Sequence, residues 1–353
     1  MLNSCAFFRF LGKPVACAPY GNGHINVTYL VKTDAGRDYI MQKINHRVFR
    51  DVPGLMRNIS AVTRHLRKKE PEPRRVLTLI QTLDGADYRQ DDEGNYWRAY
   101  DFITHSICLE QPETLADFYQ SAVAFGNFQN MLAAFPADTL SETIHRFHDT
   151  PDRYAKFHTS IKENKASRLD EAGPEIAFAL AREAEAGKMM GMLRAGELPL
   201  RVTHNDTKLN NVMLDKDTRQ ALCVIDLDTV MPGLAGNDFG DSIRFGASTA
   251  AEDERDLSKV RFSLPAYEAY TQGFLAACGD NLTPGEIDTL PLGAKLMTLE
   301  CGLRFLTDYL EGDTYFATHR PGQNLDRCRT QFKLVAEMED KWGEMAEVIE
   351  KYR

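Results

Sequence analysis

The chain has 353 residues, of which 43% are hydrophobic, and it carries a formal net charge of -9. A chain of this length is usually divided between two domains or lobes. The acidic balance argues against a surface that binds nucleic acid or an anionic membrane, although it is compatible with a local basic pocket for a phosphate.

Seven cysteines are scattered without a C-x-x-C pair, and most have apolar neighbours. This usage is typical of buried thiols in a reducing compartment. No apolar run is long enough to span a membrane, and the apolar N-terminus lacks the basic start and the long core of a secretory signal. We therefore expect a cytoplasmic protein with no membrane association, and we infer no obligate protein partner from the sequence.

The first hundred residues have the pattern of a small β-rich lobe. Residues 25–32 and 39–44 are rich in β-branched and aromatic side chains, and the turn TDAGRD between them predicts a hairpin. Residues 53–69 place apolar side chains at helical spacing, and EPEPRR ends this helix. A further strand at residues 76–82 and a hairpin that ends near residue 103 complete an antiparallel sheet of about five strands with one long helix.

From about residue 114 the pattern becomes helical. Further helical patterns occupy roughly residues 160–195, 253–280, 285–311 and 323–352, and one β-rich island at residues 200–230 interrupts them. We therefore predict an α+β chain of two lobes. Residues 1–103 form the β-rich N-terminal lobe, and residues 104–353 form the larger, mainly helical C-terminal lobe.

The β-rich island contains a polar loop, HNDTKLNN, at residues 204–211 between short apolar strands. Asp206 and Asn211 lie five positions apart on this loop, and Asp226 ends a β-branched strand downstream. The spacing is that of the kinase catalytic loop and its strand-end metal aspartate. In phosphoryl transfer one carboxylate accepts or orients the proton of the acceptor hydroxyl, and another, with an amide oxygen, holds the Mg²⁺ of ATP.

Each of these features alone also has a purely structural interpretation. An isolated H-x-D occurs by chance, asparagines form turns, and Asp226 to Asp228 can begin a helix. Between two strands, the set together favours a catalytic loop. In that loop Lys208 can reach the transferring phosphate, and we expect His204 to brace the loop and not to do acid–base chemistry.

The motifs HNDTKLNNVML, IDLDTVMPG and DFGDSIRFGAS resemble the aminoglycoside phosphotransferase and choline kinase-like superfamily, and more closely the N-acetylhexosamine 1-kinases. The similarity continues in PYGNGHINVTYLV, FHDTPDRY and ECGLRFLTDYLEGDTYFAT, so it covers nearly the whole chain. It implies a protein-kinase-like two-lobe fold. It also implies a transferase of carbohydrate metabolism that uses ATP to phosphorylate N-acetylglucosamine or N-acetylgalactosamine at the anomeric hydroxyl.

The resemblance also assigns roles to individual residues. Asp206 is the base that accepts the sugar hydroxyl proton, and Asn211 and Asp226 bind Mg²⁺. Asp228 either contributes to the metal site through water or hydrogen bonds, or braces the loop.

The stretch YGNGHIN, residues 20–26, is the candidate phosphate-covering loop. Gly21 and Gly23 allow the backbone to approach phosphate oxygens closely, although a simple hairpin turn uses the same residues. Its place at the head of the β-rich lobe favours the nucleotide role. Asn26 lies at the mouth of the loop, and the resemblance suggests that His24 reaches the sugar, with a capped turn as the alternative.

The third strand of a kinase lobe normally carries a lysine for the nucleotide phosphates. Here Gln42 and Lys43 are adjacent and point to opposite faces of the strand, so only one can face the nucleotide. Lys43 is the candidate, but the usual role of the lysine stays open. By analogy of fold, the adenine lies against the backbone of residues 101–105, where Asp101 and Ile103 are the candidate contacts.

A sugar site requires hydrogen-bonding side chains on a rigid wall, often with an aromatic ring. Arg304 and Asp308 share one face of a predicted helix, either as a surface ion pair or as part of the sugar site. The resemblance points to Arg304 and Tyr315 as sugar contacts. We expect Asp238 and Asp241 to fix the catalytic loop from beneath and not to touch substrate, and we interpret FHDTP, residues 147–151, as a helix cap.

Other functions stay open on the sequence alone. The same fold could phosphorylate choline, homoserine, methylthioribose or an aminoglycoside, although the aromatic cage that choline prefers is not evident. The presence of all three catalytic and metal residues argues against a nucleotide-binding pseudokinase. A metal-dependent hydrolase is disfavoured because the histidines lack zinc-ligand spacing.

Overall fold

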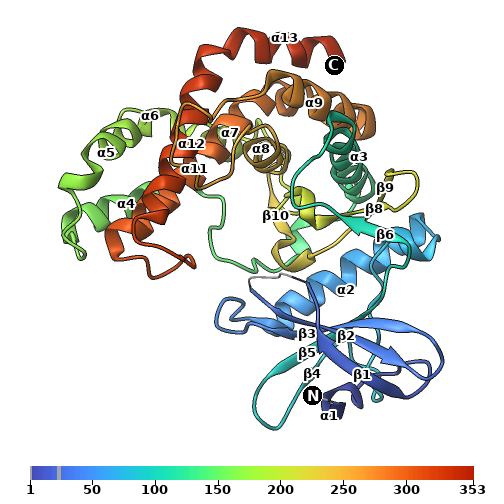
Figure 1. The fold of residues 1–353 in the computed structure, drawn as a ribbon. Coiled ribbons are helices and arrows are strands. Elements are labelled where there is room, and N and C mark those ends of the chain that lie inside the picture. The colour runs from blue at the N-terminus through green and yellow to red at the C-terminus, as the bar shows by residue number, and fades with distance from the viewer. Residues whose placement is uncertain (1, 22–24) are drawn as a thin grey trace. The chain divides into compact units, whose positions relative to one another are not determined.

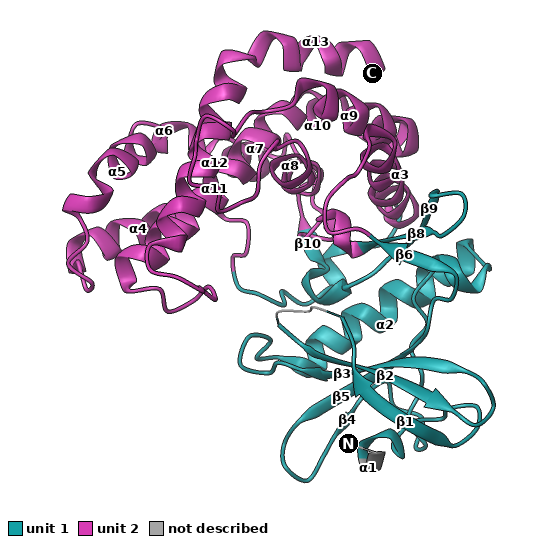
Figure 2. Cartoon of the chain, viewed as in Figure 1, with its two compact units in different colours: residues 1–108, 134–145, 212–232 teal, residues 109–133, 146–211, 233–353 magenta. Residues whose placement is uncertain are grey.

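The computed structural model describes residues 2–21 and 25–353 and divides the chain into two compact units (Figure 2). Unit 1 consists of residues 1–108, 134–145 and 212–232, and unit 2 consists of residues 109–133, 146–211 and 233–353. Two segments of unit 1 therefore come from the middle of the chain. One of them, residues 212–232, includes the strand-end aspartate Asp226.

The described part of unit 1 is built on a five-stranded antiparallel sheet in the order β1-β2-β3-β5-β4 (Figure 1). The strands are β1 (Pro14–Pro19), β2 (Val27–Thr33), β3 (Asp38–Ile44), β4 (Arg89–Gln90) and β5 (Tyr96–Asp101). The predicted hairpin of β2 and β3 is confirmed. The predicted strand at residues 76–82 is wrong, because this segment forms only isolated bridges, and β1 is the strand that the pattern missed.

The two faces of this sheet have different chemistry. One face packs Tyr29, Val31, Met41 and Trp97 into an apolar core. Because side chains alternate along a strand, the register places the polar residues Thr28, Gln42 and Arg98 together on the other face.

The long helix of unit 1 is α2 (Val52–Lys69), as predicted. Asp51 caps its N-terminus by accepting a hydrogen bond from the Gly54 amide at 2.9 Å, and Pro53 occupies the first turn, where its missing N–H costs no helical bond. Short elements are α1 (Leu2–Cys5), η1 (Pro73–Arg75) and η2 (Ala137–Thr139). A second sheet, in the order β6-β8-β9, joins β6 (Ser106–Cys108), β8 (Val212–Asp215) and β9 (Ala221–Val224).

Unit 2 is mainly helical, as predicted (Figure 1). Its longer helices are α3 (Leu115–Leu132), α4 (Thr150–Glu163), α8 (Ala235–Gly246), α9 (Leu264–Cys278), α11 (Leu290–Glu311), α12 (Gln323–Asp340) and α13 (Trp342–Tyr352). Shorter elements are α5 (Gly173–Leu180), α6 (Glu183–Ala186), α7 (Lys188–Ala195), α10 (Pro284–Asp288), η3 (Asp170–Ala172), η4 (Leu209–Asn211) and η6 (Gly279–Asn281). The β-rich island is confirmed by the strands β7 (Arg201–Thr203), β8, β9 and β10 (Met231–Gly233), and η5 (Leu227–Thr229) lies between the last two.

Several predicted helix limits were wrong for local reasons. The pattern at residues 160–195 is broken into pieces, because α4 ends where Asn164 adopts a left-handed conformation (φ 41°). The helix predicted from residue 253 begins at Leu264, after Ser263 caps the amide of Ala266.

Helix α8 was not anticipated, because its glycines favour a loop. It packs against α11 so closely that a Cβ at Gly240 would overlap the backbone of Gly293, and a Cβ at Gly293 would overlap the carbonyl of Gly236. Glycine is therefore required for the approach of these two helices, and tertiary packing outweighs the poor helix propensity.

Most of the cysteines are buried, as expected, namely Cys5, Cys223, Cys278, Cys301 and Cys328. Cys17 is half-buried and Cys108 is exposed. Among the described residues, no helix is long and apolar enough to cross a membrane.

Candidate active site

The loop at residues 204–207 is held by two carboxylates of α8. Asp238 accepts hydrogen bonds from the amides of His204 at 2.9 Å and Asn205 at 2.7 Å, and Asp241 accepts one from the amide of Thr207 at 2.8 Å. Both aspartates are buried. Because a buried amide needs an acceptor, these bonds fix the backbone of the loop. The expectation that Asp238 and Asp241 hold the loop is confirmed.

Two hydroxyl groups complete this support. The Thr207 hydroxyl donates to the carbonyl of Asp238 at 2.5 Å, and the Ser242 hydroxyl donates to the carbonyl of Thr207 at 2.7 Å. The ring of His204 is fully buried against Phe125 and Phe128. This burial agrees with the bracing role expected for His204.

The side chain of Asp206 is half-buried, and two predicted site residues meet it. The Lys208 ammonium lies 3.1 Å from one carboxylate oxygen, and the Asn211 amide nitrogen donates to the other at 3.0 Å. The Asn211 nitrogen also donates to the Asp206 carbonyl at 2.7 Å. The Asp206 carboxylate raises the pKa of the Lys208 ammonium. Unit 2 thus presents a fixed carboxylate, a cation and an amide as one cluster.

Asp226, in unit 1, follows β9 and precedes η5. Its backbone is left-handed, with φ at 56°, and its side chain is exposed. Aspartate adopts this conformation more readily than most residues with a side chain. Asp228, two residues later, is buried and holds this segment against the sheet of the same unit.

Asp228 has two partners in unit 1. Its carboxylate accepts a hydrogen bond from the Asn26 amide at 2.5 Å and forms an ion pair with Arg98. The Asn26 amide oxygen in turn accepts the amide of Asn45 at 2.9 Å. Both polar groups of the Asn26 side chain are therefore engaged in bracing, and Asp228 takes the bracing role that the sequence left open.

Arg98 is a functional candidate that sequence reasoning missed. Its side chain is 1% exposed, and its Nε donates to Gln42 Oε1 at 2.9 Å. Burial disfavours its charge, but the surrounding groups, chiefly the Asp228 carboxylate, together raise the pKa of the Arg98 guanidinium. Gln42 therefore lies on the polar face of the sheet with Arg98, which binds Asp228, whereas Lys43 lies on the opposite face with Trp97. The only available signal was a charged residue at the centre of an aromatic strand.

The remaining nucleotide candidates also lie in unit 1. Gly21 is left-handed (φ 73°), as glycine allows, and Gly23 and His24 lie outside the described residues. Asp101 is bonded by Arg37 at 2.9 Å, and Ile103 is buried beside Leu222 and Cys223.

The proposed sugar residues Arg304 and Tyr315 do lie together in unit 2. The Arg304 guanidinium carbon is 5.9 Å from the ring centre of Tyr315, 5.4 Å from that of Phe316 and 5.3 Å from that of Phe147. Asp308 is not the ion-pair partner of Arg304. Its carboxylate instead accepts the amides of Tyr315 at 2.7 Å and Phe316 at 2.9 Å, and so it shapes the loop that carries Tyr315.

Each of the two proposed metal ligands, Asp226 in unit 1 and Asn211 in unit 2, carries a side-chain oxygen of the kind that suits Mg²⁺. This ion prefers oxygen ligands and usually takes one or two from the protein besides phosphate and water. Asp226 offers an exposed carboxylate, and the Asn211 amide turns its nitrogen toward Asp206, so its oxygen points away from that carboxylate. Within residues 2–21 and 25–353, no group of three or more His, Cys, Asp or Glu side chains is arranged to hold a metal.

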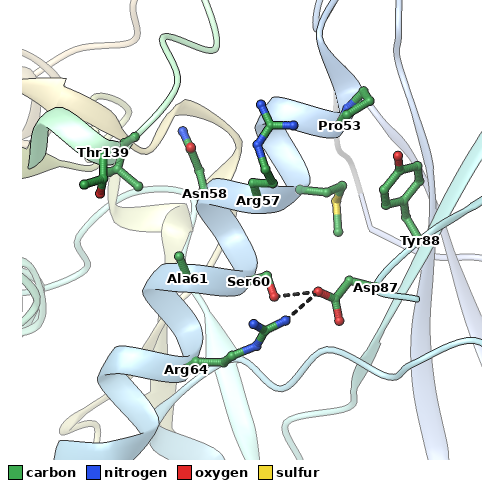
Figure 3. A pocket seen from close by; sticks show the side chains of 11 residues that line it. Pro53, Arg57, Asn58, Ser60, Ala61, Arg64, Asp87, Tyr88 and Thr139 are labelled. Atoms are coloured by element: carbon green, nitrogen blue, oxygen red, sulfur yellow. Dashed lines mark hydrogen bonds and ion pairs between the residues drawn. The ribbon is translucent and has the colours of Figure 1, made fainter. Parts of the chain in front are cut away.

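A separate cavity of about 530 Å³ lies beside α2 in unit 1 (Figure 3). Arg64 and Ser60 both bind Asp87 within it, at 2.9 and 2.5 Å. Its lining includes none of the site residues predicted from the sequence. Because Asp87 is already satisfied by Ser60 and Arg64, we assign this cavity no part in catalysis.

Comparison with known proteins places these features in context. The model of the phosphotransferase enzyme family, APH, matches residues 16–272. Three solved structures are also similar. An aminopropanol kinase associated with a microcompartment has 16% identity, coverage of 98% of this chain and 97% of that one, and a TM-score of 0.59. Amicoumacin kinase in complex with AMP-PNP and Ca²⁺ has 13% identity, coverage of 96% of this chain and 92% of that one, and a TM-score of 0.64. Choline kinase from Cryptosporidium parvum Iowa II has 14% identity, coverage of 96% of this chain and 92% of that one, and a TM-score of 0.57.

At these identities the structural likeness shows the fold alone. That fold is the predicted kinase-like one, with an antiparallel sheet in one lobe and a helical second lobe.

Proposed function

Because the chain belongs to the phosphotransferase enzyme family, we propose that it transfers the γ-phosphoryl group of ATP to a hydroxyl group of a small molecule. The observation that carries this proposal is the cluster around Asp206. The Asp206 carboxylate is half-buried and lies 3.1 Å from the Lys208 ammonium. It belongs to a loop whose backbone amides are bound by the buried Asp238. Phosphoryl transfer depends mainly on such positioning and on electrostatic stabilisation.

The residues would divide the work as follows. Asp206 accepts the proton of the attacking hydroxyl, and Lys208 faces the negative charge of the transferring phosphoryl group. Asn211 and Asp226 would hold Mg²⁺, which when bound neutralises the charge that develops on the phosphate oxygens.

For the acceptor we propose an N-acetylhexosamine, phosphorylated at its anomeric hydroxyl. The resemblance of the motifs to N-acetylhexosamine 1-kinases supports this choice, as does the wall formed by Arg304, Tyr315, Phe147 and Phe316, which combines hydrogen-bond donors with aromatic rings. An anomeric hydroxyl is more acidic than an ordinary alcohol, so a carboxylate is a sufficient base.

The main alternative keeps the fold and changes the acceptor, as the aminopropanol and choline kinases among the similar structures illustrate. One contact argues against a quaternary ammonium. The rings of Phe147, Tyr315 and Phe316 already surround the Arg304 guanidinium, so a choline headgroup placed there would meet a cation.

A screen of acceptors by ADP release tests the proposal, with the product identified by phosphorus NMR. We expect turnover with N-acetylglucosamine or N-acetylgalactosamine and a signal from phosphate at C1. Phosphate at C6, or turnover only with an amino alcohol, would overturn the choice of acceptor. Asp206→Asn should abolish turnover and leave ATP affinity within about twofold, because the base is removed and the nucleotide contacts remain. A variant with near-native turnover would overturn the role of Asp206.

A further inference from the structure

His148 lies directly before α4, buried between α11 and the catalytic loop. Its Nδ1 is 2.9 Å from an oxygen of Glu300, and its Nε2 is 3.0 Å from the carbonyl oxygen of Asn205. The side chain of His148 is 9% exposed and that of Glu300 is 2% exposed. The second oxygen of Glu300 accepts the Thr150 hydroxyl at 2.8 Å. The FHDTP motif was expected only to cap a helix, which Asp149 does by accepting the amide of Asp152.

The partners of His148 define its protonation. A peptide carbonyl cannot donate a hydrogen bond, and an ionised carboxylate only accepts. A neutral imidazole has one N–H and so could serve only one of these two oxygens. Both contacts are satisfied when the ring carries two protons as an imidazolium paired with Glu300.

The charges around the pair agree with this assignment. Burial disfavours the charged ring, but Glu300 and, more weakly, Asp241 of α8 outweigh it, so the pKa of His148 is raised. Burial likewise disfavours the Glu300 carboxylate, but His148 lowers its pKa, helped by Arg153 of α4 and Arg304 of α11.

The contact with Asn205 reaches the residue that precedes the proposed base. Asn205 has φ at 64°, a left-handed conformation that is uncommon for residues with a side chain and that asparagine adopts more readily than most. Asp238 binds its amide at 2.7 Å, and His148 binds its carbonyl at 3.0 Å. Asn205 is therefore held by an anion on one side and by a cation on the other.

We propose that His148, as an imidazolium fixed by Glu300, is a positioning residue that sets the backbone direction at Asp206. The part of this inference that concerns turnover rests on the proposed function. The geometric part, that protonation of His148 controls the peptide between Asn205 and Asp206, does not.

The sign of the pH dependence follows from the raised pKa. The support is present while His148 is protonated, and it is lost as the pH rises through the pKa of His148 in the folded protein. In the Glu300→Gln variant, His148 loses the carboxylate that stabilises its protonated ring. The pKa of His148 then falls, and the alkaline limb of the kcat profile moves to lower pH.

A second histidine–glutamate pair, His158 of α4 with Glu183 of α6, serves as a matched control. His158 lies 2.8 Å from Glu183, but both side chains are about half exposed, at 49% and 42%. We expect Glu300→Gln to shift the alkaline limb of kcat by at least one pH unit, and His148→Gln to lower kcat about tenfold or more with the KM for ATP within about twofold. His158→Gln and Glu183→Gln should match the wild type in both parameters.

NMR of the whole protein separates this inference from the proposed function. With aspartate amides labelled with ¹⁵N, the Asp206 signal should shift with pH at the same midpoint as the ring signal of His148, and His148→Gln should abolish that shift. An Asp206 amide that ignores the His148 titration, or a Glu300→Gln variant with an unmoved His148 midpoint, would overturn the inference whatever the activity. If no acceptor were phosphorylated but the two titrations coincided, the proposed function would fail and the positioning contact would stand.

Discussion

Replacement of Asp238 by asparagine tests whether α8 builds the catalytic loop. One oxygen of this buried carboxylate accepts the amide of His204 and the Gln129 side chain, and the other accepts the amide of Asn205. In either orientation, the new NH₂ group of Asp238→Asn faces one of the two backbone amides. A donor then meets a donor, and one buried amide of the loop loses its acceptor.

The cost follows from the number of bonds affected. A hydrogen bond to a charged group contributes about 1.5–3 kcal/mol, and an unsatisfied buried amide costs about 1–3 kcal/mol. The Gln129 amide can rotate and so limit the loss, because its oxygen is buried without a partner among the described residues. We therefore expect the free energy of unfolding to fall by about 2–4 kcal/mol. Because Asp206 follows the disturbed amides, kcat should fall at least tenfold.

Urea denaturation followed by circular dichroism measures the loss of stability, and ADP release measures kcat. Asp280→Asn, an exposed position on η6, is the control and should change neither quantity. An Asp238→Asn protein that unfolds within about 0.5 kcal/mol of the wild type, with unchanged kcat, would refute the role that we assign to α8.

Three further outcomes are expected. Arg98→Met leaves Asp228 buried without its cation and should lower the free energy of unfolding by about 3–5 kcal/mol in urea denaturation, whereas a loss below about 1 kcal/mol would mean that the ion pair is dispensable. Gly293→Ala places a methyl group against the carbonyl of Gly236 and should lower the melting temperature measured by calorimetry by several degrees, and an unchanged melting temperature would contradict the close helix approach. Removal of Mg²⁺ with EDTA should stop ADP release, and Asp226→Asn should raise the Mg²⁺ concentration needed for half-maximal rate at least tenfold; an unaltered Mg²⁺ requirement would exclude Asp226 as a ligand.

The parts of the site that the sequence predicted are those with local spacing. Asp206, Lys208 and Asn211 are close in the chain, and the structure brings them together. The strands that flank this loop, β7 and β8, were also predicted correctly, because each depends on a short apolar pattern in its own sequence. Such local features can be predicted from the sequence without knowing how distant segments pack.

The residues that were missed depend on distant partners. Arg98 meets Asp228 across 130 positions, and His148 meets Glu300 across 152. The residues next to Arg98 and His148 in the sequence give no sign of these partners. The helix α8 was missed for the same reason, since its glycines gain their advantage only when α11 is present.

The bonds from α8 to the catalytic loop also predict how slowly that loop exchanges its protons with solvent. Exchange at the amides of His204, Asn205 and Thr207 requires their separation from the buried carboxylates of Asp238 and Asp241. Both carboxylates are buried on α8. Hydrogen exchange should therefore group the amides of His204, Asn205 and Thr207 with the most protected helices of unit 2, although the segment has no regular secondary structure. Under the proposed function, a loop held in this way meets each substrate already in its working shape.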